Sequence, residues 1–204
     1  ARVSAGAAIE SGPLGYRDLP LYGAFWKMVE HYRLAAMSAV PTVYAVLAQV
    51  PVDADISVLK YPVVGAAPLP PSVAEDFRRH TGVSLLEGYG LTETTAPLTG
   101  NLPGGIRSGT VGVPLPGSTV RIADDGEVLA KGVGVFAGYR NADDNAEAFA
   151  DGFFRTGDLG RLDDRGRLVL EGRVKDVVTT SGGKTIAPAR WEAAIEEHPL
   201  ISSA

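Results

Sequence analysis

The spacing of apolar residues, glycines and prolines changes once along this chain, and the change limits the folds open to it. Up to about Thr92, short apolar segments alternate with segments in which apolar residues recur at helical spacing. After Gly109, short strand-like segments are separated by Asp-Gly and Arg-Gly turns. The first pattern is typical of a parallel sheet covered by helices, and the second predicts a small antiparallel sheet or barrel.

The same patterns predict individual elements. Pro41 opens one helix and Pro70 or Pro71 another, because proline is well tolerated at the first position of a helix. The predicted helices cover residues 24–33, 42–50, 71–80 and 142–149, with a last one starting at Pro188. The predicted strands cover residues 35–40, 61–65, 84–88, 118–123, 127–131, 158–162, 167–171 and 174–180. We therefore expect an α/β chain, in which part of a parallel sheet is followed by a small antiparallel β-barrel.

Composition excludes several classes of function. The net charge of -5, from 19 basic and 24 acidic residues, disfavours nucleic acid and anionic membranes as partners. Cysteine is absent and the three histidines are far apart, so disulfides, a cysteine nucleophile and a zinc site are not expected. The most apolar stretch, residues 35–48, is shorter than the roughly 20 residues of a membrane span. Without a visible secretory signal, the expectation is a soluble, cytoplasmic protein.

The segment from Glu87 to Thr95 carries the densest set of chemically useful side chains. Glycines on both sides of Tyr89 would let a flat ligand approach the backbone, and the ring could stack on a base. Thr92 and Thr94 could donate to phosphate oxygens, and Glu93 is a hard oxygen ligand suited to magnesium. The alternative is a Gly-rich turn with a capping threonine, and the spacing alone leaves the two interpretations about equal.

Two later segments offer complementary chemistry. Asp158, in Thr156-Gly157-Asp158, could accept hydrogen bonds from both hydroxyls of a ribose. The segment Gly172-Arg173-Val174-Lys175-Asp176 combines a glycine with two cations and could contact an anion at a moving joint. Each segment taken alone is more typical of an ordinary turn. Together with the segment around Tyr89, they supply the parts of a nucleotide site.

Three segments resemble signature motifs of the acyl-adenylate-forming enzymes: Tyr89–Glu93, Arg155–Leu159 and Gly172–Asp176. This superfamily contains the acyl-CoA synthetases, the luciferases and the adenylation domains of peptide synthetases. Further similar segments are residues 65–69, 132–139 and 188–192, with His198-Pro199. The similarity follows the order of the family over most of the chain. It is closest to the fatty-acid–CoA ligases, and Ser181–Lys184 is similar to the long-chain type.

The resemblance implies a reaction in two steps. A carboxylate attacks the α-phosphate of ATP and gives an acyl-adenylate and pyrophosphate. The C-terminal domain then rotates, and the thiol of CoA displaces AMP. The implied ligands are ATP or AMP, Mg²⁺, CoA and a small-molecule carboxylic acid, which we expect to be a fatty acid. Catalysis would then consist of positioning and electrostatic stabilisation of the phosphate charge.

The resemblance also implies a role for each matching residue. Residues implied to bind the nucleotide are Ala66, Ala67, Pro68, Glu87, Gly88, Tyr89, Gly90, Leu91, Thr92, Asp158 and Arg173. Residues implied to act in catalysis are Thr92 on phosphate, Glu93 on magnesium, Arg173 on ribose or phosphate, and Lys175 as the hinge. Gly65 and Gly90 would border the acyl pocket, and Gly183 would lie where the pantetheine arm of CoA passes.

Two parts typical of the superfamily are not found, namely the phosphate loop with its lysine and the lysine of the C-terminal domain. We therefore expect a fragment that is inactive alone. Residues 1–115 would be a remnant of the large α/β domain, 116–172 a β-barrel-like subdomain, and 173–204 the hinge and the beginning of a small α+β domain. Such a fragment would form a homo-oligomer or pair with its missing half, because parallel sheets are normally covered on both faces.

Two alternatives stay open. One is a non-catalytic remnant that binds a nucleotide or an acyl group. The other is amino-acid adenylation, aryl-acid activation or an oxidative luciferase reaction on the same scaffold. Asp18 lacks the context of an aspartate that grips an amino group, which disfavours amino-acid activation without excluding it.

Overall fold

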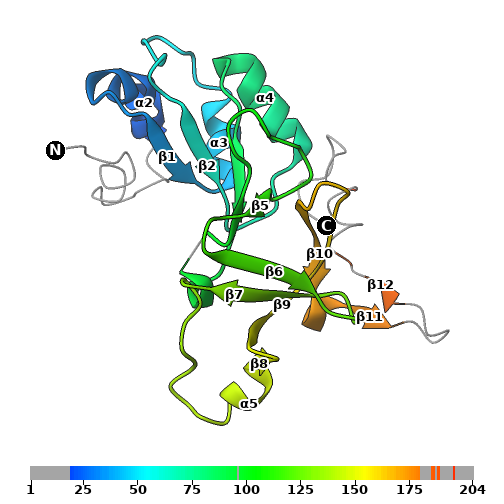
Figure 1. Cartoon of the computed structure of the whole chain (residues 1–204). Helices are drawn as coiled ribbons and strands as arrows, with labels where there is room; N and C mark the ends of the chain where they lie inside the picture. Colours follow the sequence, from blue (N-terminus) through cyan, green and yellow to red (C-terminus); the bar gives the residue numbers. More distant parts are fainter. Residues whose placement is uncertain (1–18, 96, 180–184, 187, 189–194, 196–204) are drawn as a thin grey trace. The chain divides into compact units, whose positions relative to one another are not determined.

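The computed structural model describes residues 19–95, 97–179, 185–186, 188 and 195 (Figure 1). The chain divides into two compact units. The first comprises Ala1–Glu87 with Pro103–Ser108, and the second comprises Gly88–Leu102 with Gly109–Ala204. Strand β3 (Leu86–Tyr89) begins in the first unit and ends in the second.

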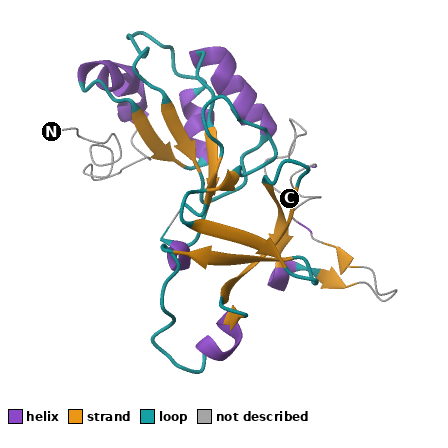
Figure 2. Ribbon diagram, in the orientation of Figure 1, coloured by secondary structure: helices purple, strands orange, loops and turns teal. Residues whose placement is uncertain are grey.

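The first unit contains the predicted parallel strands. Its elements are α2 (Leu19–His31), β1 (Ala36–Ala39), α3 (Pro41–Leu47), β2 (Tyr61–Val64), α4 (Pro71–Thr81) and the start of β3. Strand β1 pairs with β2 and β2 with β3, both in parallel, which confirms the α/β prediction for this part (Figure 2). Pro41 and Pro71 each stand at the start of a helix, as predicted. Gly82, at a φ of 72°, ends α4 in the left-handed conformation typical of a glycine cap.

The core of the first unit is built on aromatic side chains from its helices. Trp26 packs edge-on against Phe25, and Tyr44 packs edge-on against Phe77. The polar atoms of the buried rings are satisfied, because the indole N–H of Trp26 donates to the carbonyl of Val50 at 3.0 Å. The hydroxyl of Tyr44 likewise donates to the carbonyl of Val63 in β2 at 2.8 Å. The first bond joins α2 to the segment after α3, the second joins α3 to β2, and both leave a buried polar atom paired.

The second unit is mainly antiparallel. Its first strands are the end of β3, β4 (Thr99–Gly100) and β5 (Val113–Pro114), with the 3-10 helix η2 (Thr92–Thr94) between β3 and β4. The main sheet has the order β10-β9-β7-β6, and β8 pairs with β9. Its elements are β6 (Ser118–Ile122), β7 (Glu127–Gly132), α5 (Asn145–Ala148), β8 (Phe149–Ala150), β9 (Phe153–Leu162) and β10 (Leu168–Arg173).

The predicted β-barrel is wrong for the described part of the chain, where this sheet stays open. A barrel would require β6 and β10, the two ends of the order, to pair with each other. Instead, the backbone of Leu168 in β10 exchanges hydrogen bonds of 2.8 Å with Val111 and Gly112. The segment before β5 therefore occupies the edge of β10 that closure would use.

Several element boundaries also differ from the prediction. Strand β9 begins at Phe153 rather than residue 158, and helix α2 begins at Leu19 rather than residue 24. The helix predicted over 142–149 is reduced to α5, because Phe149 turns into β8. The strand predicted over 174–180 starts as the 3-10 helix η3 (Val174–Asp176), and β11 (Val178–Thr179) then pairs with β12 (Thr185–Ile186). Short apolar runs of this kind fit more than one conformation.

The helix predicted from Pro188 falls outside the described residues apart from Pro188 and Ile195. Among the described helices, none is both long and apolar enough to cross a membrane.

Candidate functional site

Strand β9 leaves its regular pairing with β7 at Thr156, Gly157 and Asp158. Glu127 of β7 faces Leu159, but Leu129, only two residues further, faces Arg155, so β9 carries two extra residues in this interval. Gly157 adopts a φ of 73°, a left-handed conformation that costs glycine little and other residues more. The Thr-Gly-Asp segment predicted to bind ribose is thus a bulge in the sheet, and bulges are typical of sites where a side chain is re-aimed.

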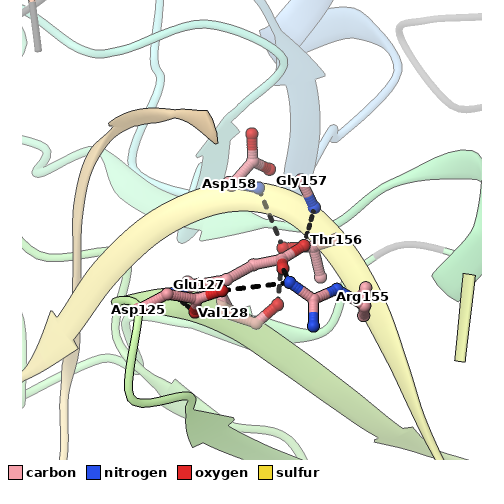
Figure 3. A network of polar contacts seen from close by, with 7 residues as sticks. All are labelled: Asp125, Glu127, Val128, Arg155, Thr156, Gly157 and Asp158. Atoms are coloured by element: carbon pink, nitrogen blue, oxygen red, sulfur yellow. Dashed lines mark hydrogen bonds and ion pairs between the residues drawn. The ribbon is translucent and has the colours of Figure 1, made fainter. Parts of the chain in front are cut away.

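Side chains replace the main-chain hydrogen bonds that the bulge interrupts (Figure 3). The hydroxyl of Thr156 donates to the carbonyl of Val128 at 2.7 Å and accepts the N–H of Asp158 at 3.2 Å. The N–H of Gly157 donates to Oε1 of Glu127 at 2.8 Å. The amides of Gly157 and Asp158 are therefore each held by a defined side-chain acceptor.

The carboxylate of Asp158 is the point where three of the predicted segments meet. It is 8% exposed, its Oδ2 accepts the hydroxyl of Tyr89 at 2.6 Å, and its Oδ1 accepts Nε of Arg173 at 3.2 Å. Burial, reinforced by the hydrogen bond to Asp158, raises the pKa of Tyr89, so that this phenol stays a neutral donor. Tyr89 was predicted to stack on a base, and in this structure it also orients the acid predicted to hold the ribose.

The remaining bonding capacity of Asp158 fits a diol. A carboxylate offers about four lone-pair directions, of which Tyr89 and Arg173 use two. Each oxygen therefore retains one acceptor direction, as two neighbouring hydroxyls would require. The side chain of Arg173 is half exposed and can carry its charge to a phosphate or a ribose oxygen.

Glu93 lies in η2, and both its backbone carbonyl and its side chain accept hydrogen bonds from residues 136–139. The N–H of Phe136 donates to its carbonyl at 2.8 Å, and the hydroxyl of Tyr139 donates to its Oε1 at 3.1 Å. Asn145 fixes Tyr139 in turn, accepting its N–H at 2.7 Å and donating to its carbonyl at 3.0 Å. The segment that ends in Tyr139 therefore orients the carboxylate predicted to bind magnesium.

The donor set around Glu93 fits a magnesium ion that is shared with phosphates. Glu93 is partly exposed and forms no ion pair within the described part of the chain. The same residues contain no group of three acidic or histidine side chains that could enclose a metal by themselves. Magnesium is commonly held by one or two carboxylates together with waters and phosphate oxygens, so a single oriented carboxylate suits it.

The two threonine hydroxyls of η2 differ in their exposure to solvent. Thr92 is exposed, which suits its predicted contact with phosphate. Thr94 is buried, and its hydroxyl accepts the N–H of Leu91 at 2.9 Å and donates to the carbonyl of Leu91 at 3.1 Å. The capping threonine of the alternative interpretation is therefore Thr94, which leaves Thr92 as the candidate phosphate donor.

Residues 65–68 lie in the first unit, in the loop after β2. Ala66, Ala67 and Pro68 are exposed and Gly65 is partly exposed. Ala66 has a φ of 66°, which is unfavourable for a residue with a Cβ atom, by about 1–2 kcal/mol. Strain of this kind is often found at ligand sites, and the sequence pattern did not reveal it.

The other predicted residues are placed as follows. Glu87 lies in β3, where burial raises the pKa of its carboxyl to about 7, and Gly88 follows it in the strand. Gly90 and Leu91 form the partly exposed link from β3 to η2. Lys175, the predicted hinge, is an exposed residue of η3. Gly183, predicted near the pantetheine path, lies outside the described residues.

Several residues that hold this site have no role implied by the sequence motifs. They are Glu127, Arg155, Tyr139 and Asn145. One signal was available for Glu127, which stands between an Asp-Gly turn and the apolar run Val128, Leu129 and Ala130. An acidic side chain at such a position requires a buried partner.

This chain is similar to known proteins in both its sequence and its fold. The family described as AMP-binding enzyme matches residues 6–140. The long-chain-fatty-acid–CoA ligase FadD15 of Mycobacterium bovis is 48% identical over 143 residues, covering 70% of this chain and 24% of that protein. The marinolic acid–CoA ligase of a Pseudoalteromonas species is 34% identical over 206 residues, covering 92% of this chain and 31% of the other.

A solved structure shows the same fold. It is the O-succinylbenzoate coenzyme A synthetase (MenE) of Bacillus subtilis in complex with ATP and magnesium ion. The two agree with a TM-score of 0.80 at 27% identity, over 89% of this chain and 40% of that one. This chain thus spans between about a quarter and two fifths of the length of these three proteins.

Proposed function

Because this chain belongs to the AMP-binding enzyme family, we propose that it forms part of the nucleotide site of an ATP-dependent acid–CoA ligase. Such an enzyme joins a carboxylate to the α-phosphate of ATP with loss of pyrophosphate, and then transfers the acyl group to the thiol of CoA. The first step requires a held ribose, a neutralised phosphate chain and an oriented carboxylate substrate.

One observation carries the proposal. The carboxylate of Asp158 accepts hydrogen bonds from Tyr89 and Arg173, and each of its oxygens can accept one more. In the proposed function, these oxygens accept the two ribose hydroxyls, Tyr89 lies beside the adenine, and Arg173 neutralises oxygen charge on the nucleotide. Ala66, Ala67 and Pro68 border the base, and Thr92 donates to phosphate.

Magnesium would be held by Glu93 and would neutralise charge on the phosphates of ATP. The contribution of this chain is to orient that carboxylate, through the Tyr139 hydroxyl and the Phe136 N–H. Lys175 is proposed as the hinge about which the following segment turns between the two steps. Its exposed position in η3 leaves it accessible for a change of backbone conformation.

For the acid, we propose a fatty acid. The support is the 48% identity to a long-chain-fatty-acid–CoA ligase over 143 residues. The structure of MenE, at 27% identity, is of an O-succinylbenzoate coenzyme A synthetase, so an aromatic acid is the alternative substrate to compare. Gly65 and Gly90 are the residues proposed to border the acyl chain, and Gly183 to border the arm of CoA.

The nucleotide role is tested by AMP binding to this chain, followed with a fluorescent AMP analogue. Replacing Asp158 by Ala should weaken binding about tenfold or more, because a charged hydrogen-bond acceptor for the ribose is removed. Asp164→Ala is the matched control, since Asp164 is an exposed acid of the same unit, in the turn between β9 and β10, and forms no ion pair within the described part of the chain. Equal affinities of the Asp158→Ala and Asp164→Ala variants would contradict the ribose role.

The acid is tested in a full-length ligase that carries this chain in place of the matching segment of the Mycobacterium bovis relative. Pyrophosphate release is measured with palmitate and with an aryl acid such as O-succinylbenzoate. A fatty-acid site predicts a clear preference for palmitate. A preference for the aryl acid would contradict the fatty-acid assignment and leave the nucleotide role intact.

A further inference from the structure

Glu127 is an acid that the proposed chemistry does not use, although it is the most buried charged residue of the described chain. It is 3% exposed and stands at the start of β7, followed by the buried residues Val128, Leu129 and Ala130. A carboxylate at such a position is costly unless cations and hydrogen-bond donors surround it. Its partners therefore indicate why it is there.

Two partners satisfy the carboxylate of Glu127 (Figure 3). Its Oε2 forms an ion pair with the guanidinium of Arg155, and its Oε1 accepts the N–H of Gly157 at 2.8 Å. Arg155 also contacts Oδ2 of Asp125 at 3.1 Å, and Oδ1 of Asp125 accepts the N–H of Glu127 at 3.1 Å. The turn before β7 and the strand β9 are thus joined through an ion pair in which Glu127 is buried and the side chain of Arg155 is 35% exposed.

Stability alone does not explain this arrangement. The charge of Glu127 must leave water, and solvent at the partly exposed Arg155 weakens the attraction between the two, so such a pair adds little stability by itself. The bond from Gly157 to Glu127 differs from such a pair, because it ends on the backbone directly before Asp158. It fixes the Thr156–Gly157 peptide and so helps to hold Gly157 at the φ of 73° from which the chain continues into Asp158.

We propose that Glu127, held by Arg155, is a positioning residue for Asp158. By accepting the N–H of Gly157, it keeps the bulge in the conformation in which Asp158 meets both Tyr89 and Arg173. The effect on nucleotide binding rests on the proposed function, in which Asp158 holds the ribose. The effect on the Tyr89–Asp158 contact does not depend on any ligand.

The first experiment measures that contact in the nucleotide-free chain. The seven tyrosines are labelled with ¹³C at the ζ carbon, and the Tyr89 resonance is assigned by its loss in Tyr89→Phe. The resonance in Asp158→Ala marks the position without the hydrogen bond. Glu75→Gln, which neutralises an exposed acid paired with Arg78 in the first unit, should leave the Tyr89 resonance unchanged.

Two double variants separate the acceptor from the charges. Glu127→Leu with Arg155→Met removes both charges and the acceptor, and should fold because no unpaired charge remains buried. Its Tyr89 resonance should move at least half way to that of Asp158→Ala. Glu127→Gln with Arg155→Gln also removes both charges but retains an acceptor for Gly157, and its Tyr89 resonance should stay near that of the unaltered chain.

A purely structural role predicts a different result. Leu129→Ala, a buried residue two positions along β7, should lower the melting temperature and leave the Tyr89 resonance in place. If the Leu–Met double variant behaves in the same way, the positioning role is overturned. If the Gln–Gln double variant shifts Tyr89 as far as the Leu–Met variant, the acceptor is not what positions Asp158, and the proposal also fails.

Nucleotide affinity distinguishes this inference from the proposed function. If both hold, the Leu–Met double variant weakens AMP binding about tenfold and the Gln–Gln variant changes it little. If Asp158→Ala leaves AMP binding unchanged while the Leu–Met variant still moves Tyr89, the ribose role fails and the positioning role stands. If Asp158→Ala weakens binding and the Leu–Met variant changes neither Tyr89 nor the affinity, the positioning role alone fails.

Discussion

Arg173 lies directly opposite Asp158 across the ladder between β10 and β9, with its Nε 3.2 Å from Oδ1 of the acid. The two residues are paired although the register of the ladder shifts between Leu170 and Gly172. One irregularity in each strand therefore brings the predicted ribose acceptor and the predicted basic joint to the same point. A slip of one residue would turn one of these side chains to the other face of the sheet.

Replacing Arg173 by Gln should weaken AMP binding about tenfold, because a charged hydrogen bond contributes about 1.5–3 kcal/mol. The same substitution at Arg161 is the control. Arg161 is also in this sheet, and its ion pair with Glu171 is exposed and remote from Asp158 in the ladder. The measurement is a titration of each variant with the fluorescent AMP analogue. Equal loss in both variants would indicate a general electrostatic effect rather than a contact.

Glu93→Gln should reduce the part of ATP binding that depends on magnesium and leave AMP binding nearly unchanged. The reason is that an amide is a much weaker magnesium ligand than a carboxylate, whereas its shape is the same. Glu147→Gln, at an exposed position of α5, serves as the control. Affinities for ATP are measured with and without magnesium. A magnesium effect that survives in Glu93→Gln would exclude this residue as the ligand.

Glu87 should make the stability of the chain depend on pH. Burial raises the pKa of its carboxyl from 4.5 to about 7, so the folded state binds more protons than the unfolded state between these values. Its contribution is complete below about pH 4.5 and is lost as the pH rises through about 7. Glu87→Gln cannot ionise, so its melting temperature should exceed that of the unaltered chain increasingly as the pH rises through this window. A constant difference between the two would contradict the raised pKa.

Ala66→Gly should stabilise the chain by about 1 kcal/mol, because glycine adopts a φ of 66° without the penalty of a Cβ atom. Ala67→Gly, at the next residue of the same loop, lacks this benefit and should be neutral or destabilising. Both are compared by denaturant unfolding. Stabilisation by both, or by neither, would mean that the conformation of Ala66 is not the cause.

Gly112→Ala should prevent stable folding of the second unit. A Cβ atom there would overlap the backbone of Gly100 and Asn101, and its φ of 80° is unfavourable for alanine. Gly23→Ala is the contrasting variant, because a Cβ atom in α2 meets no atom within 4 Å. This second change should raise stability by about 0.5–1 kcal/mol through helix propensity. Circular dichroism melts of both variants test the pair, and a stable, folded Gly112→Ala chain would contradict it.

Local patterns in the sequence predicted the elements of the first unit well. Alternating apolar segments identified β1, β2 and β3, and Pro41 and Pro71 marked the starts of two helices. These signals succeed because proline at a helix start and apolar periodicity act within a few residues. The closed barrel failed for the opposite reason. Whether an edge strand closes a sheet depends on which distant backbone reaches it, and Val111 and Gly112 reach β10.

The candidate site shows the same division between local and distant information. Residue types and their order determined the chemistry to expect: an aromatic ring at Tyr89, acids at Glu93 and Asp158, and a cation at Arg173. Only the tertiary structure decided that the hydroxyl of Tyr89 meets Asp158, from which it is separated by 69 residues, and that Tyr139 meets Glu93 across 46. It also decided the two-residue bulge in β9 and the burial of Glu127 beneath it. The physical reason is that a side chain's role depends on its partners, and strand register and packing bring those partners together from distant parts of the chain.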